Sequence, residues 1–367
     1  MTKMLEARLK KQKQLGLWRE RKRHKHKLNF ASNDYLSLSK HPKVIEAFQQ
    51  AAKDYGVGST ASQMVCGYTD VHAELEQALA DYIGYDKVVL FANGFMANHA
   101  VINTLCNRHD VIVADKYCHA SMIDAAQASG ASLKRYAHAD IQSASQLLET
   151  HTPKLIMTDA VFSMQGNLAP LNQLAQLAKQ YNSGLYVDDA HGFGVLGDGK
   201  GSVAECGLTQ TDAPVMMATF GKALGGYGAF VAGRADIMDA ILQFSRTAIY
   251  TTALPAACAA AALAALQIVQ EQPWRRQHVL SLADQLQQQL ISHEILPSQS
   301  AIRSIMMPDS KAMMLAYQAL LDSGIVVGAM RPPTVPVKTS RLRLGVCAAH
   351  SSQHVEQLIE LLSHAIS

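Results

Sequence analysis

Hydrophobic residues in the middle of the chain fall into short runs, separated by longer segments with helical spacing. From residue 70 onward these runs are KVVLFA, DVIVAD, KLIMTDA, GLYVDDAH, PVMMATF and GAFVAG. Their length and composition are typical of buried strands. Helical patterns begin at Phe95, at Ser121 and after Pro170, between consecutive runs. This alternation predicts a mostly parallel sheet with helices on both faces.

The segment before this region has a different pattern. Residues 3–23 place leucines and Trp18 among charged residues and predict a helix, whereas residues 28–39 read as a short strand and turn. His41-Pro42 opens a predicted helix that runs to about Asp54, because proline is favoured in the first helical turn. Residues 56–69 lack any period and predict a loop.

The pattern changes again after Pro255. Long helices are predicted over residues 255–270 and 274–293, and the runs RSIMMP, GIVVGAM and SRLRLGV follow as strands. This order indicates a smaller α+β domain. We therefore predict three parts, which are an N-terminal arm over residues 1–36, a large domain over 37–255 and a small C-terminal domain over 256–367.

The composition is that of a soluble globular protein, with 49% hydrophobic and 17% charged residues. No apolar run has membrane-spanning length and the N-terminus lacks the apolar core of a secretion signal, so we expect a cytoplasmic protein without a membrane partner. The six cysteines contain no CxxC pair and the 15 histidines show no zinc-binding spacing. Neither disulfides nor a metal site is expected.

Positive charge is concentrated at the N-terminus. Residues 1–27 hold 11 Lys/Arg and 2 Asp/Glu, whereas the remainder carries a net charge of −6. The run RERKRHKHK fits a solvated basic helix end, a landing patch for an acidic partner or substrate, or a nucleic-acid contact. Nucleic acid ranks last, because no aromatic interleaving or recognised binding motif accompanies the charge.

One glycine-rich segment, MMATFGKALGGYGAF, carries a lysine directly after a predicted buried strand. Lys222 is followed by Gly225, Gly226 and Gly228. Glycines leave room for a flat ligand, and partial burial lowers the pKa of an amine toward nucleophilicity. A lysine in such a turn is more often a solvated surface residue, so its neighbours in the fold must decide.

Polar residues also follow the other strands, at the edge where parallel sheets bind ligands. They are Asn93-Gly94-Phe95, His119, Ser163, and Asp188, Asp189 and His191. Each has a simpler explanation as a helix cap or a satisfied buried polar group. Together with Lys222 they fit pyridoxal phosphate, which needs a Schiff-base lysine, an acid for the ring nitrogen and a phosphate cradle. Dinucleotide chemistry fits poorly, since no GxGxxG follows an early strand.

The motifs NDYLSLS, NGFMAN, HAS, FSMQGNLAPL, VDDAHGFGVLG and TFGKALGG occur in this order, followed by IYTTALP, RPPTVP and RLRL. With them the chain resembles the α-oxoamine synthase family of fold-type I pyridoxal-phosphate enzymes, over essentially its whole length. The resemblance implies an α/β fold with a mostly parallel central sheet flanked by helices, a smaller C-terminal α+β domain and an N-terminal helical arm. It also implies pyridoxal 5'-phosphate as cofactor and a homodimer with shared active sites.

The resemblance further implies a role for each matching residue. Lys222 forms the Schiff base and shuttles the Cα proton, Asp188 pairs with the pyridinium nitrogen, and His119 stacks on the ring; these three are the implied catalytic residues, and His119 also contacts substrate. The other implied contacts are His191 and Ser163 to the ring hydroxyl, Gly94, Phe95 and Thr219 to the phosphate, Thr251 and Thr252 to the phosphate in the neighbouring subunit, Arg343 and Asn33 to the amino-acid carboxylate, and Thr334 and Arg19 to the acyl substrate.

The implied activity is a pyridoxal-phosphate-dependent acyl transfer with decarboxylation. RPPTVP with RLRL most resembles the branch of the family that joins L-alanine to a pimeloyl thioester, carried by coenzyme A or by acyl carrier protein. Alternatives are a 2-amino-3-ketobutyrate ligase, 5-aminolevulinate synthase or serine palmitoyltransferase within the family, an aminotransferase, and a non-enzymatic binding protein that uses the basic arm. A role of the arm in recruiting an acidic acyl carrier protein is a hypothesis from charge alone.

Overall fold

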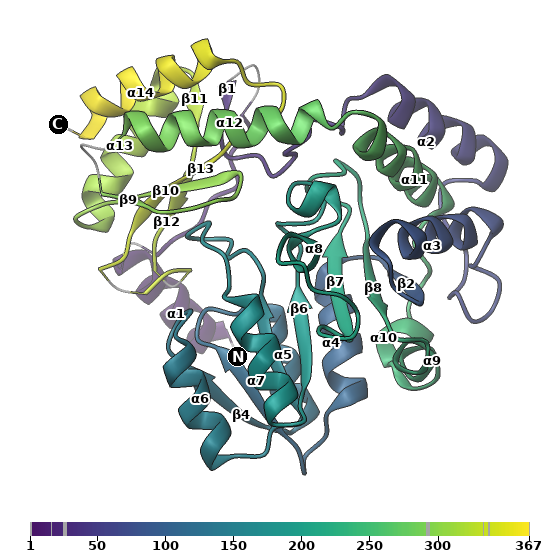
Figure 1. Ribbon diagram of the computed structural model, residues 1–367. Helices are drawn as coiled ribbons and strands as arrows, with labels where there is room; N and C mark the ends of the chain where they lie inside the picture. Colours follow the sequence, from purple (N-terminus) through teal and green to yellow (C-terminus); the bar gives the residue numbers. More distant parts are fainter. Residues whose placement is uncertain are drawn as a thin grey trace.

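The computed structural model describes residues 2–15, 17–24, 28–290, 294–332, 334–336 and 338–366. A seven-stranded sheet of order β2-β8-β7-β6-β5-β3-β4 forms its centre (Figure 1). The strands are β2 (Lys87–Phe91), β3 (Val111–Asp115), β4 (Ser132–Tyr136), β5 (Leu155–Asp159), β6 (Gly184–Asp188), β7 (Val215–Thr219) and β8 (Ala229–Gly233). Only β8 is antiparallel to its neighbours. The predicted mostly parallel sheet is confirmed.

Helices cover both faces of this sheet, because its strands bury side chains on both sides. One face packs against α4 (Gly94–Leu105), α5 (Ala120–Ser129), α9 (Ala235–Phe244) and α10 (Arg246–Ile249). The other packs against α3 (Asp70–Ile83), α6 (Ile141–Thr150), α7 (Leu171–Gln180) and α8 (Ser202–Glu205), with the 3-10 turn η1 (Gly197–Gly199) beside α8. Strand β3 shows the alternation, since Ile112 and Ala114 belong to the first core and Val113 to the second.

A smaller antiparallel sheet of order β12-β13-β10-β9 forms the C-terminal part. Its strands are β9 (Ile295–Leu296), β10 (Ile302–Met306), β12 (Gly328–Met330) and β13 (Arg341–Gly345), and the helices around it are α12 (Trp274–Gln289), α13 (Ser310–Asp322) and α14 (Ser352–Ile366) (Figure 1). Strand β1 (Leu28–Asn29) pairs in parallel with β11 (Ile325–Val326). The sequence run GIVVGAM thus divides between two sheets.

The predicted domain boundaries at 36/37 and 255/256 remain predictions. Helix α11 (Ala256–Glu271), just beyond the second boundary, packs against α2 (Pro42–Tyr55) and α3. None of the helices in the described part of the chain is long and apolar enough to cross a membrane.

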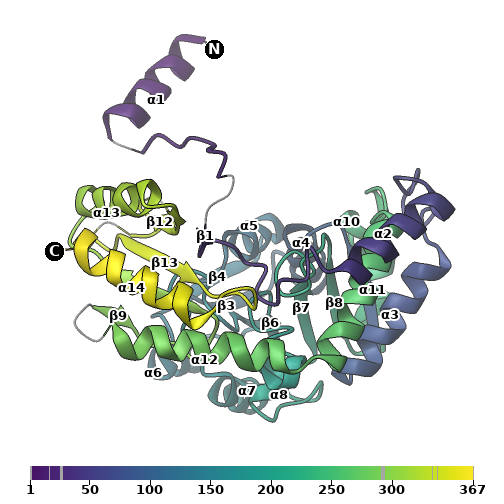
Figure 2. The same cartoon turned by 90° about the horizontal axis from the view of Figure 1, so that it is seen from above.

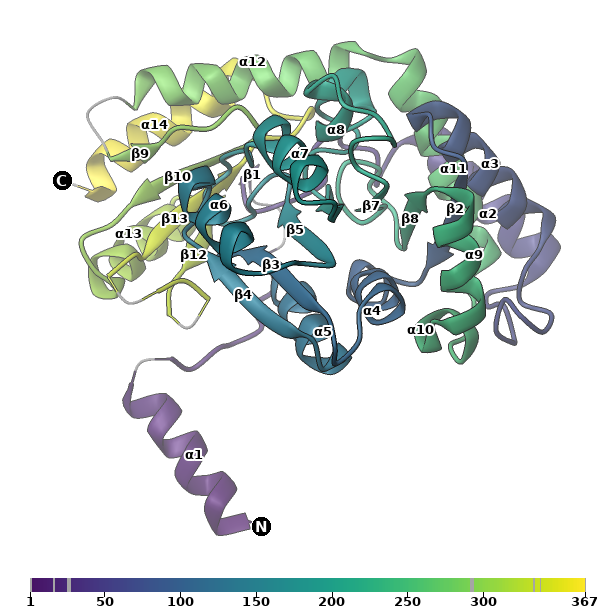
Figure 3. The same ribbon diagram turned by 60° about the horizontal axis from the view of Figure 1, so that its bottom comes forward.

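The N-terminal arm is helical over a shorter stretch than predicted. Helix α1 covers Thr2–Gln14 and lies apart from the packed body of the molecule (Figures 2 and 3), but residues 17–24 are extended, so the predicted helix over 3–23 is wrong beyond residue 15. Clustered like charges oppose helix formation there. Tertiary bonds hold the extended segment, because Arg331 Nη2 donates to the Trp18 carbonyl at 2.7 Å.

Candidate active site

The chemistry-bearing residues meet at the carboxyl edge of the large sheet. Strands β2, β3, β5, β6 and β7 run in the same direction, so their last residues lie along one edge. Lys222 follows β7 and is close enough to Asp188, Asp159 and Arg343 for their charges to affect it. Of the residues predicted at the strand ends, Asp188 at the end of β6 and Lys222 after β7 thus lie near each other at this edge.

Lys222 sits in a tight turn after β7. The Gly225 N–H donates to the Lys222 carbonyl at 2.9 Å, and Gly225 has φ +65°, which glycine adopts without strain. The side chain is half-buried. Burial lowers the pKa of the Lys222 ammonium to about 8, with Arg343 adding to the shift and Asp188 and Asp159 opposing it. The amine is therefore far easier to deprotonate than an ordinary lysine.

Asp188 is buried and held by two donors. Its Oδ2 accepts from Asn98 Nδ2 at 2.8 Å, and its Oδ1 accepts from the Ala190 N–H at 3.1 Å. Asn98 is itself fixed, because the Tyr186 hydroxyl donates to its Oδ1 and its Nδ2 also donates to Ser121 Oγ at 2.8 Å. The carboxylate is thus held at the strand end in one orientation, as a partner for a ring nitrogen requires.

His119 caps α5 and is exposed on one side. The backbone N–H of His119 donates to Asp159 Oδ2 at 2.7 Å, and its ring Nδ1 lies 2.7 Å from Ser121 Oγ. The Ser121 N–H also points at Nδ1, at 3.3 Å. These contacts at Nδ1 fix the orientation of the ring, which can lie against a flat ligand.

His191, Tyr35 and Arg343 form a second network beside Lys222. The Tyr35 hydroxyl is 2.7 Å from His191 Nδ1 and accepts from Arg343 Nη2 at 3.2 Å. Arg343 also donates to Asn33 Oδ1 at 3.0 Å and to the Ser163 carbonyl at 2.6 Å. Burial, with the charges of Lys222 and Arg343, lowers the pKa of His191 well below its ordinary value, so this imidazole is neutral.

The start of α4 offers a place for an anion. Asn93 Oδ1 accepts from the Met96 N–H at 3.0 Å and leaves the N–H groups of Gly94 and Phe95 at the open helix end. A Cβ at Gly94 would lie 2.8 Å from Met217 Cε and 2.9 Å from Thr219 Cγ2, so the strand approaches the helix closely here. Thr219 Oγ1 is buried without a hydrogen-bond partner in the described chain. This unpaired hydroxyl beside a helix N-terminus fits a phosphate group.

Three of the predicted contacts are not visible within one chain. The described residues offer no hydrogen-bond partner for the Ser163 hydroxyl, whereas its carbonyl accepts from Arg343. The Thr251 hydroxyl donates to the Thr247 carbonyl at 2.6 Å, and Thr252 forms an isolated bridge with Ser62. No recorded contact in the described chain joins Thr251 or Thr252 to Lys222.

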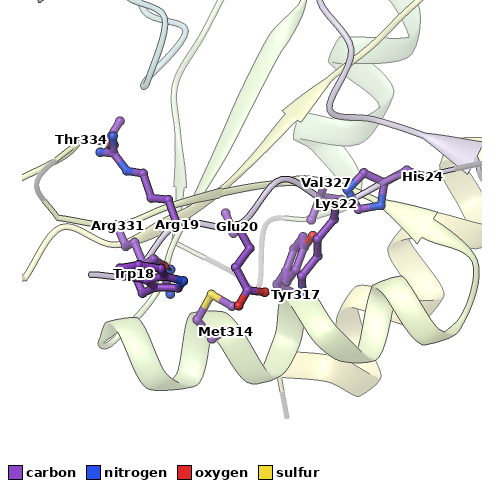
Figure 4. Close-up of a pocket in the computed structure, with 11 residues that line it drawn as sticks. Trp18, Arg19, Glu20, Lys22, His24, Met314, Tyr317, Val327, Arg331 and Thr334 are labelled. Carbon is purple, nitrogen blue, oxygen red and sulfur yellow. Dashed lines mark hydrogen bonds between the residues drawn. The ribbon is translucent and has the colours of Figure 1, made fainter. Parts of the chain in front are cut away.

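Arg19 and Thr334 are brought together, as their predicted common role requires. Arg19 Nη2 donates to Thr334 Oγ1 at 3.0 Å across 315 positions of sequence. Both line a cavity of about 560 Å³ between residues 18–24, α13 and the end of β12 (Figure 4). The lining of this cavity includes neither Lys222 nor Arg343. The two residues are thus brought together in a cavity separate from the residues around Lys222.

Sequence reasoning missed four residues that organise the site, namely Tyr35, Asn98, Ser121 and Asp159. Asn98 had a detectable signal, since it is a polar residue among the apolar positions of a predicted helix. Tyr35 and Ser121 stood inside the quoted motifs NDYLSLS and HAS, and Asp159 inside LIMTDA. Their partners become apparent only when the strands are aligned.

The chain matches the model of the aminotransferase class I and II family over residues 25–362, and it belongs to that family. Among its relatives, the 8-amino-7-oxononanoate synthase of Saccharophagus degradans is 46% identical over 342 residues, which are 92% of this chain and 86% of the relative. The enzyme of the same name from Cellvibrio japonicus is 45% identical over 346 residues, covering 93% and 87%.

Solved structures give the same picture. A serine palmitoyltransferase from S. paucimobilis superposes with a TM-score of 0.89 at 29% identity, covering 92% of this chain and 87% of that one. An 8-amino-7-oxononanoate synthase from Francisella tularensis superposes with a TM-score of 0.82 at 31% identity, covering 93% and 98%. The resemblance to α-oxoamine synthases and the fold-type I architecture are confirmed.

The family and its PLP-bound neighbours indicate pyridoxal 5'-phosphate as the cofactor. The residues of this chain fit that group. Lys222 provides a readily deprotonated amine, Asp188 a fixed buried carboxyl group, and the α4 start with the unpaired Thr219 hydroxyl a phosphate cradle. His119 supplies a ring at the edge of the same site.

Proposed function

We propose that the chain catalyses the decarboxylative condensation of L-alanine with a pimeloyl thioester, giving 8-amino-7-oxononanoate, CO2 and the free thiol. The observation that carries this proposal is the 46% identity, over 92% of the chain, to an 8-amino-7-oxononanoate synthase. Lys222 and Asp188 at the edge of the large sheet, with Arg343 of the small sheet near them, supply the groups that such a reaction needs. The reaction belongs to biotin ring assembly.

Pyridoxal phosphate, when bound, supplies an electron sink for the carbanion formed at the Cα of the amino acid. The residues of this chain bind the cofactor, orient the substrate and transfer the protons. Lys222 Nζ would hold the cofactor and, as a free amine beside the bound amino acid, would take the Cα proton and later return one to the product. Its lowered pKa, about 8, suits an amine that must both accept and release a proton near neutral pH.

Arg343 orients the amino acid by binding its carboxylate, and Asn33 is the second contact. The guanidinium is buried and its Nε and Nη2 are fixed by Ser163, Asn33 and Tyr35. Nη1 has no protein partner in the described chain, so it is available to a substrate carboxylate. Binding through a preset arginine aligns the Cα–H bond toward Lys222.

Asp188 and His191 set the electronics around the ring. Asp188, held by Asn98, would keep a proton on the ring nitrogen of the bound cofactor and so strengthen the electron-withdrawing effect of the ring. His191, kept neutral by burial, contacts the ring hydroxyl together with Ser163. His119 would lie against the ring face and contact substrate, while Gly94, Phe95 and Thr219 would hold the phosphate.

A homodimer completes the site in this proposal. Thr251 and Thr252 bind the phosphate of the cofactor in the neighbouring subunit. Support comes from the neighbouring Tyr250, which is 71% exposed, and from Val57, which is 91% exposed, since large apolar side chains this exposed favour a surface covered by a second copy.

The acyl substrate contacts Arg19 and Thr334, and its carrier is coenzyme A or acyl carrier protein. We expect neither nucleic acid nor a membrane as partner and a cytoplasmic location, to which the six free cysteines are suited.

The test is to identify the product by mass spectrometry after mixing holoenzyme, L-alanine and a pimeloyl thioester. 8-Amino-7-oxononanoate with one CO2 released per turnover supports the proposal. Because the S. paucimobilis neighbour is a serine palmitoyltransferase, serine with palmitoyl-CoA and glycine with acetyl-CoA are run in parallel. A faster reaction with serine or glycine would replace the proposed function by that of another family member.

A further inference from the structure

The loop between β5 and α7 joins the large sheet to the small one. Residues 162–167 of this loop close on themselves, because the Phe162 N–H donates to the Asn167 carbonyl at 3.0 Å and the Gly166 N–H to the Phe162 carbonyl at 2.7 Å. Three carbonyls of the loop accept hydrogen bonds from side chains of the small sheet and of its β9–β10 connection, namely Ser163 from Arg343 Nε at 2.6 Å, Met164 from Ser304 Oγ at 2.7 Å and Gly166 from Ser298 Oγ at 2.7 Å. The position of the loop therefore decides where these acceptors lie.

His138 holds this loop from the side of the large sheet. Its Nδ1 lies 3.0 Å from Oδ1 of Asp115, at the end of β3, and the Asp115 side chain is only 1% exposed. Its Nε2 faces the side-chain amide of Asn167, with Nδ2 at 3.1 Å and Oδ1 at 3.3 Å. The ring also packs edge-on against Phe162, with the ring centres 4.3 Å apart. His138 thus connects a buried carboxyl group of the large sheet to both ends of the loop.

Arg343 depends on the same loop for the orientation of its guanidinium group. Nη2 donates to Asn33 and Tyr35, whereas the acceptor of Nε in the described chain is the Ser163 carbonyl. Because the guanidinium group is planar, bonds at two of its nitrogens set the direction of the third. A shift of the Ser163 carbonyl would therefore turn Nη1, the nitrogen that the proposed function assigns to the substrate carboxylate.

We infer that His138 is a positioning residue for the amino-acid substrate, which acts through Asn167 and residues 162–167 on Arg343. The inference rests on the proposed function, because that function assigns the carboxylate to Arg343. It concerns a group that alanine, glycine and serine share, so it holds for each of them. The alternative is that His138 only stabilises the turn after β4, through its contact with Asp115.

Two amide substitutions separate these roles, because each keeps one of the two ring contacts. Asparagine places its amide where Nδ1 lies and keeps the contact to Asp115, whereas glutamine reaches the place of Nε2 and keeps the contact to Asn167. In the holoenzyme, His138→Asn should raise KM for L-alanine about tenfold, the effect of one hydrogen bond to a charged group, and His138→Gln should stay close to the wild type. KM for the pimeloyl thioester should be unchanged in both, since Arg343 is assigned to the amino acid.

Asn167→Ala removes the other half of the contact and tests the route. It should raise KM for L-alanine as His138→Asn does, and the double variant should show no further increase, because the two residues act through one contact. His278→Ala is the matched control, since this half-buried histidine has its Nε2 2.8 Å from the His350 carbonyl, away from the loop. It should leave both KM values unchanged. Increases in KM that multiply in the double variant would contradict the route through Asn167.

Binding of L-alanine is also measured without turnover, as the rise in the melting temperature of the holoenzyme with L-alanine concentration. The concentration that gives half of this rise should be about tenfold higher in His138→Asn than in His138→Gln. Equal values in these two variants would overturn the inference and leave His138 a structural role. If the wild type binds glycine or serine but not L-alanine, the proposed function fails instead, and the same comparison with that amino acid decides the role of His138.

Discussion

Asp159 and Asp188 are register partners at the ends of the parallel strands β5 and β6, and both side chains are buried. Two carboxyl groups this close cannot both be ionised without cost. Burial, and then the charge of Asp188, raise the pKa of Asp159 well above its ordinary value, while the His119 N–H and Lys222 oppose the shift. The site thus contains a carboxyl group that favours its protonated form beside the one assigned to the cofactor.

The first prediction concerns Asp159→Asn in the apoprotein. Because the folded pKa of Asp159 is raised, the folded state binds more protons than the unfolded state above the ordinary carboxyl pKa of about 4, so Asp159 lowers the free energy of unfolding as pH rises through this range. Asparagine can accept the same His119 N–H. Urea unfolding between pH 5 and 7.5 measures the effect. The free energy of unfolding should fall less steeply with pH in the variant than in the wild type, by up to about 1.4 kcal/mol per pH unit.

The matched control is Asp124→Asn, an exposed aspartate on α5. It should show the pH dependence of the wild type. An Asp159→Asn variant whose unfolding free energy falls with pH as steeply as that of the wild type would rule out the proton on Asp159.

The second prediction uses the lowered pKa of Lys222. Only the neutral amine attacks the aldehyde of pyridoxal phosphate, so its capture by apoenzyme should accelerate about tenfold per pH unit below pH 8 and level off above it. Stopped-flow absorbance at pH 6 to 10 measures this rate. Lys222→Ala should fold normally and show neither covalent capture nor turnover. A rate that still rises about tenfold per pH unit up to pH 10, as expected for an ordinary lysine with a pKa of about 10.4, would contradict the burial argument.

Most of the large domain could be predicted from the sequence, because its strands are buried on both faces and read as continuous apolar runs. Strand β4 was not predicted from the sequence, for a physical reason. It lies at the sheet edge, and its Lys134 and Arg135 interrupt the apolar pattern, as charges on edge strands often do. The extended conformation of residues 17–24 was also not predicted, because hydrogen bonds to residues more than 300 positions away hold this segment.

From the sequence, the polar residues of the site could be predicted for each strand end separately. A parallel sheet brings its carboxyl ends together, so Lys222 and Asp188 could be grouped from the sequence alone. The residues that support them could not, because Asn98 reaches Asp188 across 90 positions and Arg343 reaches Tyr35 across 308. No local pattern encodes such pairs.

The third prediction concerns Tyr35→Phe. Its hydroxyl lies between His191 and Arg343, so its removal leaves Arg343 Nη2 bonded to Asn33 alone. A hydrogen bond to a charged group contributes about 1.5 kcal/mol, so KM for L-alanine should rise about tenfold with little change in the melting temperature. Tyr85→Phe is the control, since the Tyr85 hydroxyl is also buried but donates to the Ala213 carbonyl. Equal KM values for L-alanine in the two variants would show that Tyr35 does not contribute to substrate binding.

The fourth prediction concerns Gly94→Ala, at the start of α4. The added Cβ would lie 2.8 Å from Met217 Cε and 2.9 Å from Thr219 Cγ2, so these two side chains must shift. We expect a loss of about 1–3 kcal/mol of stability and at least tenfold weaker cofactor binding, because the displaced Thr219 is a predicted phosphate contact. Thermal unfolding and fluorescence titration with pyridoxal phosphate measure the two effects. Gly58→Ala, where a Cβ meets nothing within 4 Å, should change neither. Undiminished cofactor affinity in Gly94→Ala would place the phosphate elsewhere.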